Sequence, residues 1–164
     1  MQRANNMTEL TQSRLKELLH YNPYTGIFNW IKRKGNVAGY SDKGYIRIRV
    51  QDKLYAAHRL AWLYTHKTFP TNEIDHINRI KDDNRLINLR EATRLQNNTN
   101  VGARANNTSG MKGVCLHKPS GKWVAGISIK GKSKHLGYFT TKQEAHAAYC
   151  KAADEHHKEF ANYG

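Results

Sequence analysis

Residues 45–50 alternate between apolar and polar side chains. Ile46, Ile48 and Val50 fall on one face, and Tyr45, Arg47 and Arg49 fall on the other. A period of two is typical of a β-strand with one buried face. We therefore predict a strand that packs on one side and is cationic on the other.

Other segments of the N-terminal half show helical spacing or short apolar runs. Residues 11–20 place three leucines on one helical face before Asn22-Pro23, and residues 58–66 repeat the pattern. Thr93 and Gln96 match a capping box, so a helix is expected to start there. Short strands are predicted at residues 27–31, 54–56, 73–77 and 89–92.

The C-terminal part predicts three strands followed by one helix. The strands are expected at residues 112–116, 122–129 and 133–139. Thr141 and Glu144 form a second capping box, and the helix after it carries alanines and Tyr149 on one face. We expect this face to cover the sheet, with Trp123, Tyr138 and Phe139 in the core between them.

Residues 98–109 separate these two parts and are rich in Asn, Thr, Gly, Ser and Ala. Such a composition is typical of a linker. The sequence therefore predicts an α+β protein with an N-terminal module at residues 1–97 and a C-terminal module at residues 110–164.

Charge indicates the kind of partner. The 164 residues include 27 Lys and Arg against 13 Asp and Glu, a formal net charge of +14. A small protein with so positive a field is expected to bind a polyanion. No segment approaches the roughly 20 apolar residues of a membrane span, and residues 1–6 lack an apolar signal region. We expect a cytoplasmic protein without a membrane segment.

The two cysteines do not suggest a metal or disulfide framework. Cys115 and Cys150 form no Cys-x-x-Cys pair. We expect both to be reduced, small core residues.

The chemistry is expected at Asp75-His76, which is followed by Asn88 and Asn97. Phosphodiester cleavage needs a divalent cation held by oxygen ligands and a base that activates water. A neutral imidazole supplies the base, and carboxylate and amide oxygens supply ligands. An Asp-His pair alone is commonly just the end of a strand, so the prediction depends on the whole spaced set.

The same residues resemble the HNH endonucleases of the homing and phage type. The resemblance is carried by residues 57–62, 74–77, 83–85, 88–90, 93 and 97. It implies a ββα-metal (His-Me finger) motif at about residues 73–100. By position, His76 would be the general base, Asp75 and Asn97 would bind one Mg²⁺ or Mn²⁺, and Asn88 would hold the loop that orients the base. The last position is asparagine rather than histidine, and oxygen-only ligation favours Mg²⁺ or Mn²⁺ over zinc.

Several basic residues near this motif have more than one interpretation. His58 would pack against the motif, touch a phosphate or cap a helix, and packing is preferred. Arg47 and Arg49 would be solvated or contact phosphates. Arg85 and Arg90 would clamp the DNA backbone or form surface ion pairs with nearby acids.

The region from Gly110 to about Tyr163 resembles the APETALA/ethylene-response-factor (ERF) DNA-binding domain. The resemblance implies that the three-stranded sheet enters the major groove. Cys115, Gly126 and Ser128 stand where base-reading residues are usual in that family, so no target sequence follows. The expected DNA contacts are Lys112, His117, Lys122, Ser128, Lys130, Lys132, Lys134 and His135.

Charge along the C-terminal module agrees with that expectation. Six lysines and no acidic residue lie between Gly110 and Thr140, whereas all four acids of the module lie at residues 144–159. The sheet is therefore expected to be its cationic side, with salt-dependent binding to phosphates.

Together these features predict an HNH endonuclease that nicks or cleaves double-stranded DNA, with the C-terminal module binding the target. We expect a monomer without an obligate protein partner. Two alternatives stay open. One is a DNA-binding regulator that keeps the nuclease scaffold without cleaving, and the other is an RNA-binding accessory protein.

Overall fold

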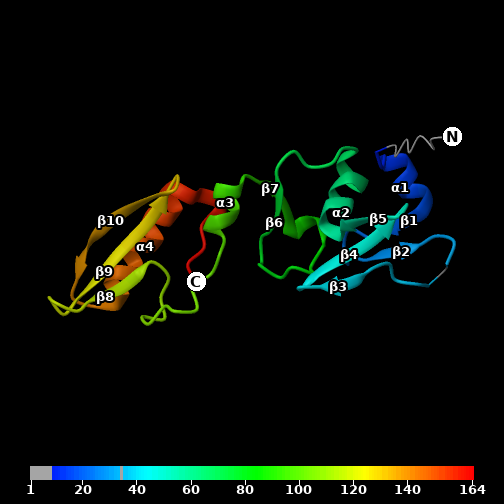
Figure 1. The fold of residues 1–164 in the computed structure, drawn as a ribbon. Coiled ribbons are helices and arrows are strands. Elements are labelled where there is room, and N and C mark those ends of the chain that lie inside the picture. The colour runs from blue at the N-terminus through cyan, green and yellow to red at the C-terminus, as the bar shows by residue number, and fades with distance from the viewer. Residues whose placement is uncertain (1–8, 34) are drawn as a thin grey trace, which may run out of the picture. The chain divides into compact units, whose positions relative to one another are not determined.

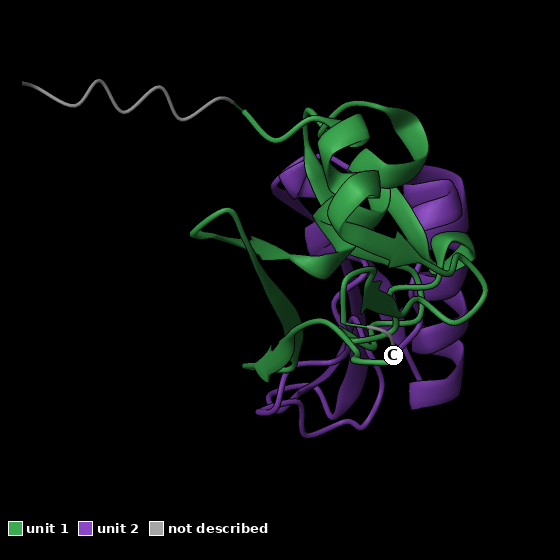
Figure 2. Cartoon of the chain, turned by 90° about the vertical axis from the view of Figure 1, so that its right-hand side faces the viewer, with its two compact units in different colours: residues 1–91 green, residues 92–164 purple. Residues whose placement is uncertain are grey.

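The computed structural model describes residues 9–33 and 35–164, so the polar N-terminus considered above lies outside the described residues. The chain divides into two compact units, Met1–Glu91 and Ala92–Gly164 (Figure 2). The division falls before the segment expected to be a linker, and the expected limits of independently folding modules stay a prediction.

The described residues of the first unit form two helices and three small sheets (Figure 1). Strands β3, β4 and β5 form an antiparallel sheet in that order. Strand β1 pairs with β2, and β6 pairs with β7. The elements are α1 (Gln12–Leu18), β1 (Leu19–Tyr21), β2 (Phe28–Trp30), β3 (Tyr40–Asp42), β4 (Tyr45–Val50), β5 (Lys53–Ala56), α2 (Ala57–His66), β6 (Glu73–His76), the 3-10 turn η1 (Leu86–Asn88) and β7 (Leu89–Ala92).

The strand predicted at residues 45–50 is confirmed as β4. Ile48 and Val50 are fully buried in a core with Leu15, Phe28 and Leu60. This core lies among α1, α2 and the strands β2 and β4. The alternation of residues 45–50 in the sequence therefore corresponds to a packed face and a more exposed face of β4.

The first helix is shorter than expected because a strand follows it directly. Helix α1 ends at Leu18, and Leu19 already has an extended backbone. Leu19 and Tyr21 are buried and the residue between them is exposed. Pairing with β2 satisfies the backbone of residues 19–21 while both large side chains enter the core, which a continued helix would not achieve.

The second unit contains the expected sheet and helix. The antiparallel sheet has the order β10-β9-β8, and α4 covers one face, where Val114, Ala125 and Ile127 meet Ala145 and Tyr149 (Figure 1). The elements are α3 (Arg94–Thr99), β8 (Val114–His117), β9 (Lys122–Ile129), β10 (Lys132–Phe139), α4 (Lys142–His157) and the 3-10 turn η2 (Lys158–Phe160). The α+β class is confirmed.

Two residues expected in this core lie elsewhere. Trp123 and Phe139 do pack between sheet and helix, but the Tyr138 side chain is 54% exposed. A register shift between His135 and Gly137 is the cause, because a bulge moves the residues after it to the opposite face. Cys115 is exposed too, because it pairs with Val124, outside the alternate positions that face α4.

The segment after α3 is tied down by its own polar side chains. Ser109 is buried, and its hydroxyl donates to Val114 O at 2.8 Å. Asn107 Nδ2 donates to Met111 O at 2.8 Å. Asn162 Nδ2 donates to Asn100 O at 3.1 Å. The polar composition that predicts a linker is used here for hydrogen bonds within the second unit.

Candidate active site

Asp75 and His76 are the last two residues of strand β6, and both are buried. Asp75 is 4% exposed and His76 is 6% exposed. Arg90 on β7 donates from Nε and Nη2 to Asp75 Oδ2 at 2.9 and 2.7 Å. The pairing of β6 with β7 brings this charge partner to the carboxylate. A buried carboxylate needs such compensation.

The His76 ring is held from the loop that joins the two strands. Its Nε2 lies 3.3 Å from Oδ1 of Asn84. Burial lowers the pKa of His76 below its usual value, and the Asn84 hydrogen bond and the neighbouring aspartates oppose this effect. The imidazole is therefore neutral near pH 7, the form that accepts a proton from water.

Asn88 organises the same loop through both ends of its side chain. Its Nδ2 donates to Asp83 O at 2.8 Å, and its Oδ1 accepts from the Asn78 backbone N at 3.0 Å. Its carbonyl oxygen accepts from Ile77 N at 2.9 Å. These bonds close the loop between residues 77 and 88 over the end of β6.

His58 lies against the ring of His76. The two ring centroids are 5.1 Å apart with perpendicular planes, and Tyr45 contacts both rings at 5.6 and 6.1 Å. Burial, followed by the nearby His76, Arg59 and Arg47, lowers the pKa of His58 to about 3. His58 Nδ1 is a buried atom without a hydrogen-bond partner. Two neutral imidazoles therefore share this part of the unit.

The arginines expected near the motif all have partners within the first unit. Arg85 binds Asp83 with both its Nε and Nη2, at 2.8 and 2.6 Å, and this pairing lowers the pKa of Asp83 to about 2. Arg47 lies 3.5 Å from Asp42, and Arg49 donates to Asp52 O at 2.9 Å. Arg90 is turned inward to Asp75, a partner not foreseen from the sequence. Contacts of these arginines with DNA stay a prediction.

Asn97, the second expected metal ligand, lies in α3 and is half-buried. The capping box is confirmed, since the Thr93 hydroxyl accepts from Gln96 N and the Gln96 side chain accepts from Thr93 N. The helix therefore starts as the sequence predicts. Because α3 belongs to the second unit, the ligand role of Asn97 stays a prediction.

The part of the chain that contains these residues matches a protein-family model. Residues 55–99 match the family model HNH_3, described as HNH endonuclease. This segment is an HNH endonuclease domain. The match includes His58, Asp75, His76, Asn88 and Asn97. A comparison with curated proteins and one with solved structures found no match.

An HNH endonuclease domain implies a phosphodiester hydrolase acting on DNA. The HNH domain runs from β5 through α2, β6 and β7 to α3. Asn84, which contacts His76, also lies within it. The sequence includes Asn84 among the residues that carry the resemblance but assigns it no role. It stands in a polar run that reads as a solvated loop, and only the return of that loop to β6 shows its role.

A metal ion for the HNH domain would depend on few protein ligands. Residues 9–33 and 35–164 contain no cluster of three or more His, Cys, Asp or Glu side chains that could hold one. Asp75 and Asn97 offer a carboxylate and an amide oxygen, which suit Mg²⁺. Mg²⁺ commonly binds one or two carboxylates and completes its shell with water and substrate phosphates. The donor chemistry therefore fits the expected ion.

Only some of the expected DNA contacts of the second unit share one face of its sheet. His117, Lys122, Ser128 and His135 share the face opposite α4. Tyr138 joins them there, with ring centroids 5.3 Å from His117 and 5.0 Å from His135. We call these five residues the outer sheet face.

The remaining lysines lie away from the outer sheet face. Lys132 and Lys134 stand in register with Ile129 and Ile127, on the side of the sheet that carries the helix. Lys130 occupies the turn between β9 and β10. Lys112 Nζ donates to Thr99 O at 2.7 Å.

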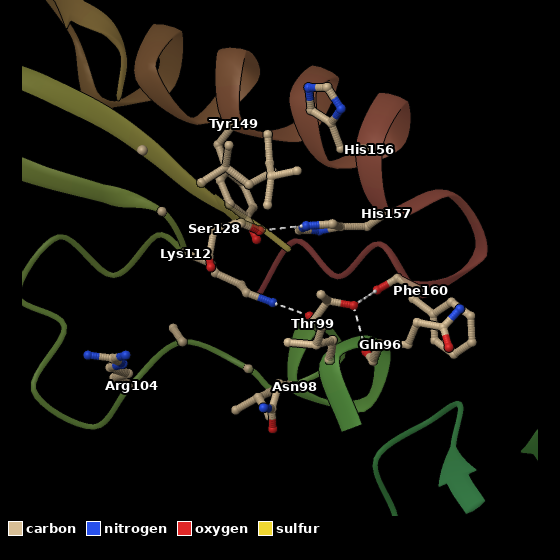
Figure 3. A pocket seen from close by; sticks show the side chains of 18 of the residues that line it. Gln96, Asn98, Thr99, Arg104, Lys112, Ser128, Tyr149, His156, His157 and Phe160 are labelled. Atoms are coloured by element: carbon tan, nitrogen blue, oxygen red, sulfur yellow. Dashed lines mark hydrogen bonds between the residues drawn. The ribbon is translucent and has the colours of Figure 1, made fainter. Parts of the chain in front are cut away.

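A cavity of about 1320 Å³ lies within the second unit (Figure 3). It is bounded by α3, the segment after it, the end of β9 and the end of α4. On its wall, Thr99 Oγ1 donates to Phe160 O at 3.1 Å, and His157 Nε2 lies 2.8 Å from Ser128 O (Figure 3). These bonds attach α3 to the C-terminal segment.

No described helix is long and apolar enough to cross a membrane.

Proposed function

We propose that the protein is a divalent-metal-dependent endonuclease of the homing type, which nicks or cleaves double-stranded DNA. The observation that supports this most is the buried Asp75-His76 pair within the segment that matches the HNH family. A buried, neutral imidazole beside a carboxylate is a costly arrangement for a purely structural strand end. It is the arrangement that a water-activating site needs.

In this proposal His76 takes the proton of the attacking water. Burial keeps the ring neutral, so it can accept this proton. Asn88 closes the loop that carries Asn84, and His58 and Tyr45 limit the movement of the ring from the side. Arg90 fixes the direction of the Asp75 carboxylate.

Asp75 and Asn97 would hold the cation. A bound divalent ion polarises the scissile phosphate and stabilises the leaving 3′ oxygen. The chain's own residues orient and activate the water. Arg49 and Arg85 are exposed and Arg47 is half-buried on the first unit, and these arginines would contact phosphates.

The second unit would bind the target, as its resemblance to ERF domains implies. Support comes from its charge, because six lysines and no acid lie between residues 110 and 140. Joining a weakly selective cleavage site to a recognition module raises its local concentration at the target. A cytoplasmic, monomeric protein is expected.

Nicking of supercoiled plasmid with and without Mg²⁺ tests the proposal. DNA carrying a cleavable site should become open-circular or linear with Mg²⁺ and stay supercoiled without it. His76→Ala should lower the rate by about 10²- to 10⁴-fold, the usual contribution of a general base. His20→Ala, an exposed histidine on β1, is the matched control and should keep the wild-type rate.

The same assay separates the alternatives. Wild-type protein that binds double-stranded DNA tightly but converts no plasmid would support the non-cleaving regulator and remove the enzyme proposal. Preferential binding of RNA over duplex DNA at equal salt would support the RNA-binding alternative.

A further inference from the structure

Asn84 is buried although it stands in a polar loop. It is 2% exposed, whereas the residues on both sides of it are more accessible. A buried side-chain amide is expected to make hydrogen bonds with both of its ends. Here Nδ2 donates to Asp82 O at 3.1 Å, and Oδ1 lies 3.3 Å from His76 Nε2.

These two contacts determine where the proton of the neutral His76 ring lies. A backbone carbonyl only accepts, so the amide must turn its NH₂ group to Asp82 and its oxygen to His76. Amide oxygen also only accepts, so Nε2 must donate. A neutral imidazole carries a single N–H, and the lone pair is therefore on Nδ1.

The position of Asn84 is fixed from a part of the chain outside residues 55–99. The Tyr21 hydroxyl donates to Asn84 O at 2.7 Å, in a buried position, and burial raises the pKa of Tyr21 to about 12, so it stays a donor. Leu86 N donates to Pro23 O at 3.0 Å. Gly26 has φ +75°, and a Cβ there would lie 2.6 Å from Asn84 C. Residues 21–26 therefore press closely on the Asn84 backbone.

We propose that Asn84 is a positioning residue that holds the proton of the His76 ring on Nε2, and that residues 21–26 hold Asn84 in place. The lone pair of the neutral ring is then on Nδ1, the nitrogen able to accept a proton. The inference rests on the proposed function for its catalytic meaning. Its structural part concerns the ring alone and is measured without DNA.

Two-bond ¹H–¹⁵N correlation spectra of the full chain test the structural part. At about pH 8 histidines with ordinary or lowered pKa values are neutral, and the His76 signals are assigned by comparison with His76→Gln. Wild type should show one tautomer, with hydrogen on Nε2, and a slowly exchanging Hε2 signal. Hydrogen on Nδ1 in wild type would overturn the proposal.

Variants separate a specific hydrogen bond from general packing. Asn84→Leu, which removes the acceptor, should abolish the protected Hε2 signal or give mixed tautomers, whereas Asn84→Asp should keep the wild-type tautomer. Asn78→Ser, in the same loop but bonded to Asp83 and Ile80, is the control and should leave the ring signals unchanged. Wild-type ring signals in Asn84→Leu would overturn the proposal.

Tyr21→Phe tests the brace and remains available if Asn84→Leu does not fold. Loss of the hydroxyl should speed Hε2 exchange of His76 by about tenfold, equivalent to a hydrogen bond of about 1.4 kcal/mol. An unchanged exchange rate would overturn the role of residues 21–26.

Cleavage kinetics connect the ring to the reaction. Asn84→Leu should lower kcat for plasmid nicking by about 100-fold, the scale of misplaced base catalysis, and Asn84→Asp should recover part of it. A fall in kcat with unchanged ring signals would overturn the proposal. If wild type cleaves no DNA, the proposed function fails while the spectra still decide the role of Asn84.

Discussion

At the scale of single residues, the first unit disfavours protonation of His58, which lies beside the expected base His76. Its ring touches His76 and Tyr45, and its environment holds the pKa near 3. The unfolded chain has a histidine pKa of about 6.5. Because folding lowers this pKa, protonation favours the unfolded state.

The stability of the protein should therefore depend on pH through His58. The stability linked to neutral His58 is fully present above about pH 6.5 and is lost as the pH falls toward about 3. Over this range the unfolding free energy changes by at most about 1.4 kcal/mol per pH unit. Between about pH 7 and pH 5, wild type should lose about 2 kcal/mol more unfolding free energy than His58→Phe. Urea unfolding at both pH values measures this. His20→Phe should keep the wild-type dependence, and equal losses in wild type and His58→Phe would contradict the prediction.

Asn88 gives a second prediction at this scale. Asn88→Ala leaves Asp83 O and Asn78 N without their side-chain partners. We expect the unfolding free energy to fall by about 2–4 kcal/mol, because buried polar groups left unpaired cost about 1–3 kcal/mol each. Asn106→Ala, at an exposed position, should change it by less than about 0.5 kcal/mol. A loss in Asn88→Ala as small as in this control would show that the loop holds itself without Asn88.

Sequence reasoning reaches these residues unequally. The sequence selects Asp75, His76, Asn88 and Asn97 as candidates, because their spacing along the chain carries a family pattern. The sequence does not identify the partners of those residues, because these contacts depend on which strands pair and on the path of the connecting loops. Arg90 reaches Asp75 only across the pairing of β6 with β7, and Asn84 reaches His76 only through the closed loop. A single sequence contains neither register nor loop path.

At the scale of elements, periodicity predicts the longer strands and helices well. β4, β9 and α2 lie within one or two residues of their expected positions, and α4 starts directly after its expected capping box. The short strands β1 and β3 carry too few residues to establish a period, and their pairing partners decide their conformation. The bulge in β10 is equally invisible in the sequence, and it alone moves Tyr138 to the outer sheet face.

The contact of β8 with α4 depends on Gly113. Its φ is +74°, and a Cβ would lie 2.1 Å from the Tyr149 ring. Gly121 has a similar φ of +65° with nothing within 4 Å. Gly121→Ala should therefore cost only the backbone strain of about 1–2 kcal/mol, and Gly113→Ala should cost at least about 2 kcal/mol more, since the ring must move. Thermal unfolding of both variants measures the difference, and equal losses would show that Tyr149 yields without cost.

At the scale of the whole molecule, the formal charge of +14 makes affinity for DNA a poor measure of specificity. Any basic surface binds phosphates, and counterion release makes that binding fall with salt. The slope of log affinity against log salt counts the phosphates contacted, at about 0.9 for each. It therefore tests which lysines of the second unit meet DNA, without knowledge of the target sequence.

Substitution by alanine should reduce this slope by about 0.9 at Lys122, on the outer sheet face, and by the same amount at Lys130, in the adjoining turn. Lys142 and Lys151 on α4 provide the matched comparison, because they lose the same charge from the helix that covers the other side of the sheet. Titrations with one DNA duplex at several salt concentrations give all the slopes. If the α4 variants lower the slope as much as the sheet variants, binding follows net charge rather than a surface, and the recognition role proposed for the sheet is lost.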